Sequence, residues 1–197
     1  GRRVGSGCAV AGRGGWGGLG AAAEQGGGLS PVELGPEAGA WSEATLLAGG
    51  HTLAEPQPGL AWRAYEGGWQ TLDQLPEAEA AGAVAEGVRA SIDLEPRPRD
   101  EHFALVYTGF LRVPEDGIYS FHLASDDGSR LRLHDRLLID HDGLHGMSVK
   151  SGRIGLKQGL HPIRVEAFNA AGGLGLELEW EGPGVDRRTV GGEHLVH

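Results

Sequence analysis

Short segments in which apolar and polar residues alternate run through the second half of this chain. The clearest covers 174–181, where Leu or Trp stands at 174, 176, 178 and 180 and Glu at 177, 179 and 181. Period-two alternation is typical of a strand that buries one face and exposes the other. Further segments of this kind cover 103–113, 119–123, 130–134, 154–156 and 163–165, and the apolar run 137–139 predicts another short strand. A chain built from so many short strands must bury their apolar faces against one another.

Turns rich in Gly and Asp separate the alternating segments. Pro-Glu-Asp-Gly at 114–117, Ser-Asp-Asp-Gly at 125–128 and Gln-Gly at 158–159 supply residues that form tight turns readily. Only 76–88 has the composition of a helix, and two glycines interrupt it, so we expect a loop or one loose helical turn there. The pattern predicts an all-β fold, an antiparallel β-sandwich of jelly-roll-like type.

The first part of the chain has a different composition. About 16 of the 36 glycines lie in the first 50 residues. Glycine loses the most backbone entropy on folding, and this stretch has little apolar area to offset the loss. We expect 1–57 to be a flexible Gly-rich linker or the end of a neighbouring domain, with an ordered strand pair around 40–53 as the alternative. The β domain is expected over 58–190, followed by a C-terminal tail over 191–197.

Charge and cysteine content exclude several classes of protein. A net charge of −10 argues against a nucleic-acid partner, because such surfaces need clustered Lys and Arg. The single cysteine, Cys8, excludes an internal disulfide framework and a thiolate zinc cluster. No apolar segment approaches the roughly 18 to 20 residues that span a bilayer, and no secretion signal opens the chain. Because the chain begins with Gly, we expect a mature or excised fragment.

No arrangement of residues predicts catalysis. The chain has no Gly-x-Ser-x-Gly motif, and Cys8 has no visible partner. The paired carboxylates Asp126 and Asp127 are adjacent on one turn, whereas glycosidases place theirs about 5 to 9 Å apart on separate elements. We therefore expect a protein that is not an enzyme.

The tetrapeptide Asp126-Asp127-Gly128-Ser129 is the best candidate for a binding site. Two adjacent carboxylates after an apolar strand repel each other, so water, a basic neighbour or a cation must make the pair tolerable. Carboxylate oxygens are ligands that Ca²⁺ prefers. Taken alone, the tetrapeptide fits a solvated β-turn better.

Two other groups allow a functional and a structural interpretation. His141 and His145 stand four residues apart, a spacing that binds zinc on a helix, but Gly143 argues against a helix here and favours loop histidines. The aromatic residues of 59–69, which are Trp62, Tyr65 and Trp69, are suited to stacking on sugars; core packing is the favoured interpretation.

Five motifs follow one another along the chain. They are GLAWRAYEGGW at 59–69, FLRVPEDGIYSF at 110–121, SDDGSRL at 125–131, DHDGLHG at 140–146 and GLHPIRV at 159–165. In this order they make the chain resemble the protective-antigen-type (PA-14) domain, a β-sandwich module of extracellular proteins. The resemblance covers roughly 58–190.

The resemblance implies a metal site. In the lectin branch of the family, two adjacent aspartates joined by a cis peptide bind Ca²⁺, an Asn and backbone carbonyls of a later loop complete the site, and sugar hydroxyls coordinate the same ion. Asp126 and Asp127 match the aspartate pair. Asn169 stands where the family's Asn-Ala loop stands, and Ala171 would supply a carbonyl.

The resemblance also implies a ligand and a location. We expect a carbohydrate-binding module outside the cell or at its surface, with a glycan as partner and with Gly128, Ser129 and Asp142 near the ligand. The alternative is a structural or protein-contact domain, accessory to an enzyme or an adhesin and without a glycan site. The loop at 170–173 lacks the aromatic residue of the flocculin-type branch, so sugar stacking of that kind is not expected.

Overall fold

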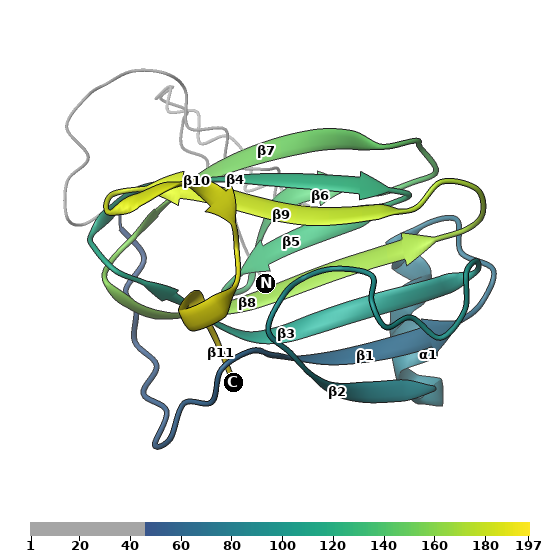
Figure 1. Cartoon of the computed structure of the whole chain (residues 1–197), viewed down its shortest axis with the longest axis horizontal. Helices are drawn as coiled ribbons and strands as arrows, with labels where there is room; N and C mark the ends of the chain where they lie inside the picture. The colour runs from purple at the N-terminus through teal and green to yellow at the C-terminus, as the bar shows by residue number, and fades with distance from the viewer. Residues whose placement is uncertain (1–45) are drawn as a thin grey trace, which may run out of the picture.

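The computed structural model describes residues 46–197 as two β-sheets that face each other (Figure 1). Its named strand pairs are all antiparallel, which confirms the predicted β-sandwich. The strands are β1 Leu60–Glu66, β2 Ala85–Arg89, β3 Phe103–Val113, β4 Gly117–Asp126, β5 Ser129–Leu133, β6 Arg136–His141, β7 Ser148–Leu156, β8 Gly159–Asn169, β9 Gly175–Gly182, β10 Val185–Thr189 and β11 Leu195–Val196. Three short helices, η2 Leu72–Gln74, α1 Leu75–Ala81 and η3 Gly192–His194, complete the described elements.

The strand order follows from the alternation in the sequence. One sheet has the order β2-β1-β3-β8-β5-β6, with β11 also paired to β3, and the other has the order β10-β9-β4-β7. In the central strand β4, Tyr119, Phe121 and Leu123 are fully buried, while the residues between them are partly exposed. Each sheet thus turns one apolar face towards the other.

The main core lies between the two sheets. Trp180 of β9 stacks on Tyr119 of β4, with ring centroids 5.4 Å apart, and lies 6.1 Å from the ring of Phe121. A second apolar cluster lies where η2 and α1 cover the other face of the larger sheet, and it contains Tyr65 and Trp69. Because Trp62 also belongs to the main core, the predicted core role of the three aromatic residues of 59–69 is confirmed.

The segment 76–88 is more ordered than expected. Its first part is helix α1, which starts with a Pro in its first turn and ends where Gly82 takes a positive φ of 103°. Its second part is strand β2, which pairs with β1 at the edge of the sheet. An edge strand exposes most of its residues, so β2 shows no alternation by which the sequence would reveal it.

The prediction of a C-terminal tail over 191–197 is wrong. Leu195 and Val196 form β11 on the edge of β3 and are buried, and His197 exchanges two backbone hydrogen bonds with Gln57. A two-residue strand is too short to show a period-two pattern, which is why the sequence analysis missed it.

The expected linker lies mostly outside the described residues, as does Cys8. Its described part, 46–57, runs along the body, where Leu47 donates a hydrogen bond to the carbonyl of Gly155 and accepts one from Lys157, both at 2.9 Å. Of the alternative strand pair around 40–53, the described part forms one β-bridge, between Leu47 and Leu156. None of the helices in 46–197 is long and apolar enough to cross a membrane.

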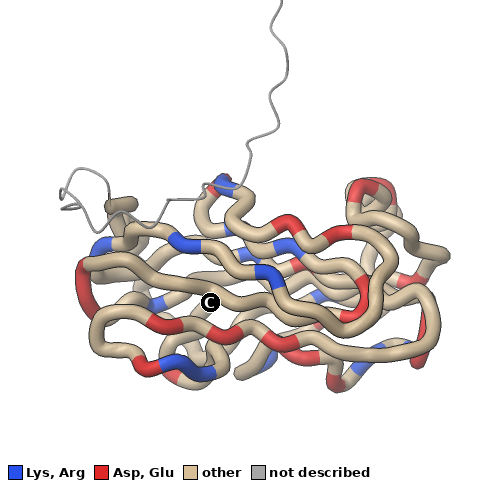
Figure 2. The backbone as a smooth tube through the Cα atoms, turned by 90° about the horizontal axis from the view of Figure 1, so that it is seen from above, with Lys and Arg blue, Asp and Glu red and all other residues tan. Residues whose placement is uncertain are grey.

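Acidic and basic residues are spread over the body. Figure 2 shows red and blue segments distributed along strands and loops, with no broad blue surface in this view.

Candidate metal and ligand site

Three loops meet at one end of the sandwich, on the right in Figure 1. They are the β4–β5 turn with Asp126 and Asp127, the β6–β7 loop over 142–147 and the β8–β9 loop over 170–174. The antiparallel register brings them together, because Ser125 of β4 pairs with Ser148 of β7 and Asp126 pairs with Gly175 of β9.

The Asp127 carboxylate connects these loops. Its Oδ1 accepts a hydrogen bond from the backbone N–H of His145 at 3.1 Å, and its Oδ2 accepts one from the N–H of Ala170 at 2.9 Å. The residue is 6% exposed. Asp127 therefore fixes the β6–β7 and β8–β9 loops relative to each other while its carboxylate retains lone pairs for a further ligand.

The carboxylate of Asp126 has no protein partner among residues 46–197. The peptide bond between Asp126 and Asp127 is cis, as the family resemblance implies. A Cβ at Gly173 would lie only 2.2 Å from Oδ2 of Asp126, so the glycine makes room for the carboxylate. No hydrogen bond or ion pair joins these oxygens to another residue within 46–197.

Asn169 brings a buried amide oxygen to the same end. It is the last residue of β8 and 1% exposed, and its Nδ2 donates a hydrogen bond to the carbonyl of Asp100 at 3.1 Å. Its Oδ1 is buried and has no hydrogen-bond partner among the described residues. A buried acceptor without a hydrogen-bond partner costs roughly 1–3 kcal/mol. A bound ligand that contacts this oxygen would remove that cost.

The β8–β9 loop is held by a segment that the sequence analysis did not single out. Besides Asp100, His102 donates its N–H to the carbonyl of Ala170 at 3.1 Å, and the Glu101 carboxylate accepts the N–H of Gly172 at 3.4 Å. These contacts join positions about 70 residues apart in the chain, and only the pairing of β3 with β8 brings them together. Ala171 itself is exposed in the loop.

The donor set fits Ca²⁺ better than a transition metal. No group of three or more His, Cys, Asp or Glu within the described part of the chain is arranged to hold a metal ion. Two carboxylates, an amide oxygen and backbone carbonyls are, however, the hard oxygen ligands that Ca²⁺ accepts.

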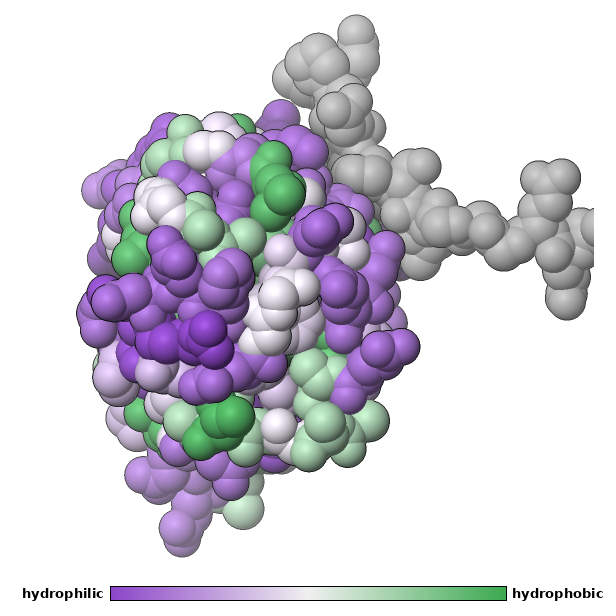
Figure 3. All heavy atoms as spheres, turned by 90° about the vertical axis from the view of Figure 1, so that its right-hand side faces the viewer, coloured by the Kyte–Doolittle hydropathy of each residue, from purple (hydrophilic) through white to green (hydrophobic). Residues whose placement is uncertain are grey.

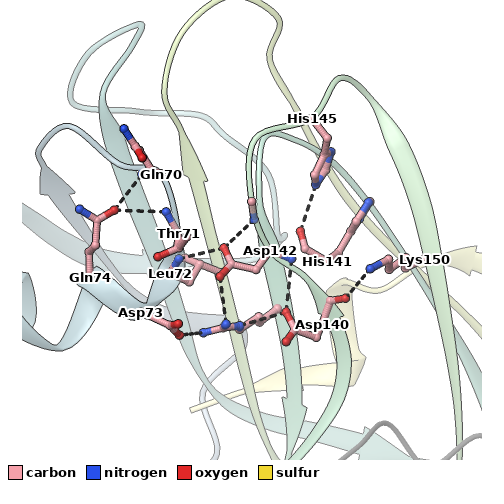
Figure 4. Close-up of polar contacts among 12 residues, drawn as sticks. Gln70, Thr71, Leu72, Asp73, Gln74, Asp140, His141, Asp142, His145 and Lys150 are labelled. Atoms are coloured by element: carbon pink, nitrogen blue, oxygen red, sulfur yellow. Dashed lines mark hydrogen bonds and ion pairs between the residues drawn. The ribbon is translucent and has the colours of Figure 1, made fainter.

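Asp142, which was expected near the ligand, has protein partners of its own. Its Oδ1 accepts the backbone N–H groups of Leu72 and Gly143, both at 2.8 Å, and its Oδ2 lies 2.9 Å from Nη2 of Arg130 (Figure 4). These partners bind both oxygens, so the carboxylate fastens η2 to the β6–β7 loop. A position of Asp142 near a ligand stays a prediction.

Arg130 gathers further acidic residues beside Asp142. Its guanidinium also lies 2.9 Å from the Asp73 carboxylate and 3.1 Å from that of Asp140 (Figure 4). Burial alone would lower the pKa of Arg130, but the hydrogen bonds that its guanidinium donates to Asp73 and Asp140 raise that pKa above its usual value. Part of the acidic cluster between 126 and 142 is therefore neutralised within the protein.

Ser129 and Gly128, which were also expected near the ligand, are both buried. Ser129 is fully buried and its hydroxyl lies 2.7 Å from that of Ser125. The carbonyl of Gly128 accepts the N–H of Phe168 at 2.9 Å, and a Cβ at Gly128 would meet the Phe168 ring at 2.4 Å. Both residues lie in the interior next to the aspartate pair and do not face solvent.

The two loop histidines are committed to each other and to the loop. The rings of His141 and His145 stack with centroids 4.0 Å apart, and Nε2 of His145 lies 3.0 Å from the carbonyl of His141. Nε2 of His141 also lies 3.0 Å from the Ser148 hydroxyl. Burial first, and then the charge of His145, lower the pKa of His141 below its usual value. His145 lies in the loop as expected, whereas His141 is the last residue of strand β6.

The fold and the loops can now be compared with known proteins. The family model of the PA14 domain matches residues 56–194. Among solved structures, an anti-sigma factor domain-containing protein superposes with a TM-score of 0.61 at 19% identity, over 71% of this chain and 48% of that chain. The chain therefore spans about half the length of that protein. No curated protein matches the chain.

Two isolated domains match over almost their whole length. The PA14 domain of the antifreeze protein MpAFP has a TM-score of 0.63 at 13% identity, covering 74% of this chain and 94% of that one. A structure described as the PA14 sugar-binding domain from an RTX adhesin has a TM-score of 0.62 at 19% identity, covering 71% and 98%. At these identities the likeness shows the fold.

Proposed function

The chain belongs to the PA14 domain family, and on that premise we propose that it is a carbohydrate-binding module whose site is the loop end around Asp126 and Asp127. The sugar-binding RTX adhesin domain of the same fold supports this class of ligand. The proposal assigns the protein no catalytic role and a place outside the cell or at its surface, fused to domains of an adhesin or an enzyme.

The observation that carries the proposal is the buried Oδ1 of Asn169, which lacks a partner among the described residues. It belongs to the residue directly before Ala170, whose N–H is bonded to the Asp127 carboxylate. We assign Asp126, Asp127, Asn169 and the carbonyl of Ala171 as the groups that hold a Ca²⁺ ion. When bound, that ion would supply a positive centre to which adjacent sugar hydroxyls coordinate.

The chain's own residues prepare this end for an ion. Asp127 binds two loops through their backbone N–H groups, which leaves Asp126 as the carboxylate that has no protein partner within 46–197. Gly173 keeps the space beside Asp126 clear of a side chain. This end of the sandwich therefore holds one carboxylate without a partner and one buried amide oxygen without a partner among residues 46–197.

One observation favours the alternative of a structural or protein-contact domain without a glycan site. Both oxygens of Asp127 already accept backbone hydrogen bonds, a sufficient reason for a carboxylate at this turn even without a metal. The two functions differ in whether Asp126 matters, because its side chain supports no loop.

The substitution Asp126→Asn separates the two functions. It keeps the shape of the side chain and removes the charge that Ca²⁺ would contact. We expect calorimetry to show Ca²⁺ uptake by the wild type and about tenfold or more weaker uptake by the variant, since ligand charge sets Ca²⁺ affinity. A glycan array run with Ca²⁺ and with a chelator should show binding in the first condition alone.

Asp135→Asn is the matched control, because it removes the same charge from the exposed β5–β6 turn at the far end of β5. It should bind Ca²⁺ and glycans as the wild type does. If the wild type takes up no Ca²⁺, or if Asp126→Asn equals Asp135→Asn, the alternative holds.

A further inference from the structure

Most of the large hydrophobic side chains that stay exposed lie at the same end of the molecule as the aspartate pair. Among the described residues the exposed ones are Val84, Val88, Leu144, Met147, Val149 and Leu174. Four of these six belong to the β6–β7 loop, the start of β7 or the β8–β9 loop. Figure 3 faces this end and shows hydrophobic patches among hydrophilic ones.

Met147 packs over the β9 residue that pairs with Asp126. A Cβ at Gly175 would be 2.5 Å from Sδ of Met147, and Gly175 is the β9 residue paired with Asp126. Ser148, the next residue along the chain, pairs with Ser125. The Met147 side chain therefore reaches over the end of β4 to β9, and yet it is 55% exposed.

Leu144 and Leu174 flank the aspartates from the two loops. Leu174 follows Gly173, the residue that packs against the Asp126 carboxylate. Leu144 precedes His145, whose N–H is bonded to Asp127. Both leucines are exposed, and neither belongs to an apolar cluster of the core. Leu144 and Leu174 are thus adjacent in the chain to residues that contact an aspartate of the site, and Met147 packs on Gly175, which pairs with Asp126.

Single exposed hydrophobic residues are ordinary on a protein surface, but a group of them next to unpaired carboxylate and amide oxygens is not required by the fold. The site thus combines oxygen atoms that can hold an ion with aliphatic side chains. Such a site suits a molecule that presents hydroxyl groups on one edge and an apolar group on the neighbouring edge. Among simple sugars, a 6-deoxyhexose has this character, since a methyl group replaces the hydroxymethyl group.

We propose that Leu144, Met147 and Leu174 are specificity-determining residues and that the site prefers 6-deoxy sugars to their 6-hydroxylated counterparts. This inference rests on the proposed carbohydrate-binding function and names its substrate class. Flexible thioether and leucine side chains adapt to a methyl group without the flat stacking that an aromatic residue gives. Transfer of one methyl group from water to such a surface changes affinity about fourfold.

The experiment compares sugars that differ only at position 6. Calorimetry in Ca²⁺ would measure the methyl glycosides of D-fucose against D-galactose and of L-rhamnose against L-mannose. In at least one pair, the wild type should bind the deoxy sugar about fourfold or more tightly. In the triple variant Leu144→Ser, Met147→Gln, Leu174→Ser this ratio should fall to about one, while the 6-hydroxylated sugar still binds.

The control variant Val84→Ser, Val88→Ser removes two equally exposed aliphatic side chains from the β2 edge and should keep the wild-type ratio. Should the triple variant unfold, Met147→Gln alone is compared with the wild type. Sugar binding without a preference in either pair, or a preference that survives the substitutions, overturns this inference and leaves the proposed function intact. If no sugar binds in Ca²⁺ on the array or in calorimetry, the proposed function fails and this inference with it.

Discussion

Gly128 shows how closely the support beneath the aspartate pair is packed. A Cβ there would lie 2.4 Å from the Phe168 ring and 2.9 Å from the backbone nitrogen of Gly143. Gly128→Ala should therefore destabilise the fold by about 1–3 kcal/mol through overpacking. Chemical denaturation would measure this loss against Gly146→Ala, a position in the adjacent loop where a Cβ meets nothing within 4 Å.

The Gly146→Ala control should unfold within about 0.5 kcal/mol of the wild type. If Gly128→Ala is equally stable, the contact between Gly128 and Phe168 is not as tight as the geometry indicates.

The sequence alone does not show which polar residues near the aspartate turn are already engaged within the protein. Asp142, Ser129 and Asp127 look alike in the sequence, and only their hydrogen-bond partners distinguish them.

A turn histidine and a strand histidine contact each other at the end of the sandwich opposite the aspartate pair. His134, in the β5–β6 turn, and His161 of β8 place Nε2 and Nδ1 2.9 Å apart, and Nε2 of His161 lies 2.8 Å from the carbonyl of Lys157. Burial lowers the pKa of both imidazoles, and for His134 the neighbouring His161 lowers it further. Folding therefore favours the neutral form of both rings.

This histidine pair makes the free energy of unfolding depend on pH. Since the folded-state pKa values are lowered, the unfolded chain binds more protons below about pH 6.5, and stability falls as pH decreases from there. Each histidine contributes a slope of up to about 1.4 kcal/mol per pH unit. Denaturation between pH 7.5 and 5.5 should show this fall, and His134→Asn, which tolerates the positive φ of 54°, should flatten it. An unchanged slope in the variant would assign the pH dependence to other groups.

At the scale of the whole molecule, the sequence predicted the two-sheet architecture because alternation records which face each strand buries. It predicted the aspartate pair and Asn169 as neighbours only through the family resemblance, since nothing local links positions 127 and 169. Strands β2 and β11 escaped prediction because an edge strand and a two-residue strand carry no periodic signal. The segment 100–102, which fixes the Asn169 loop, carries no local signal either.

The last strand tests whether the described domain folds as one unit. Leu195 lies in the main core with no exposed area, as Leu123 of the central strand β4 does. Leu195→Ala should therefore lower the free energy of unfolding by about 2–5 kcal/mol, as Leu123→Ala should, because both leave a cavity in the same core. Val88→Ala, at an exposed position of edge strand β2, should cost less than about 0.5 kcal/mol. Chemical denaturation would measure these losses. If Leu195→Ala is as stable as Val88→Ala, residues 191–197 are not part of the folded domain.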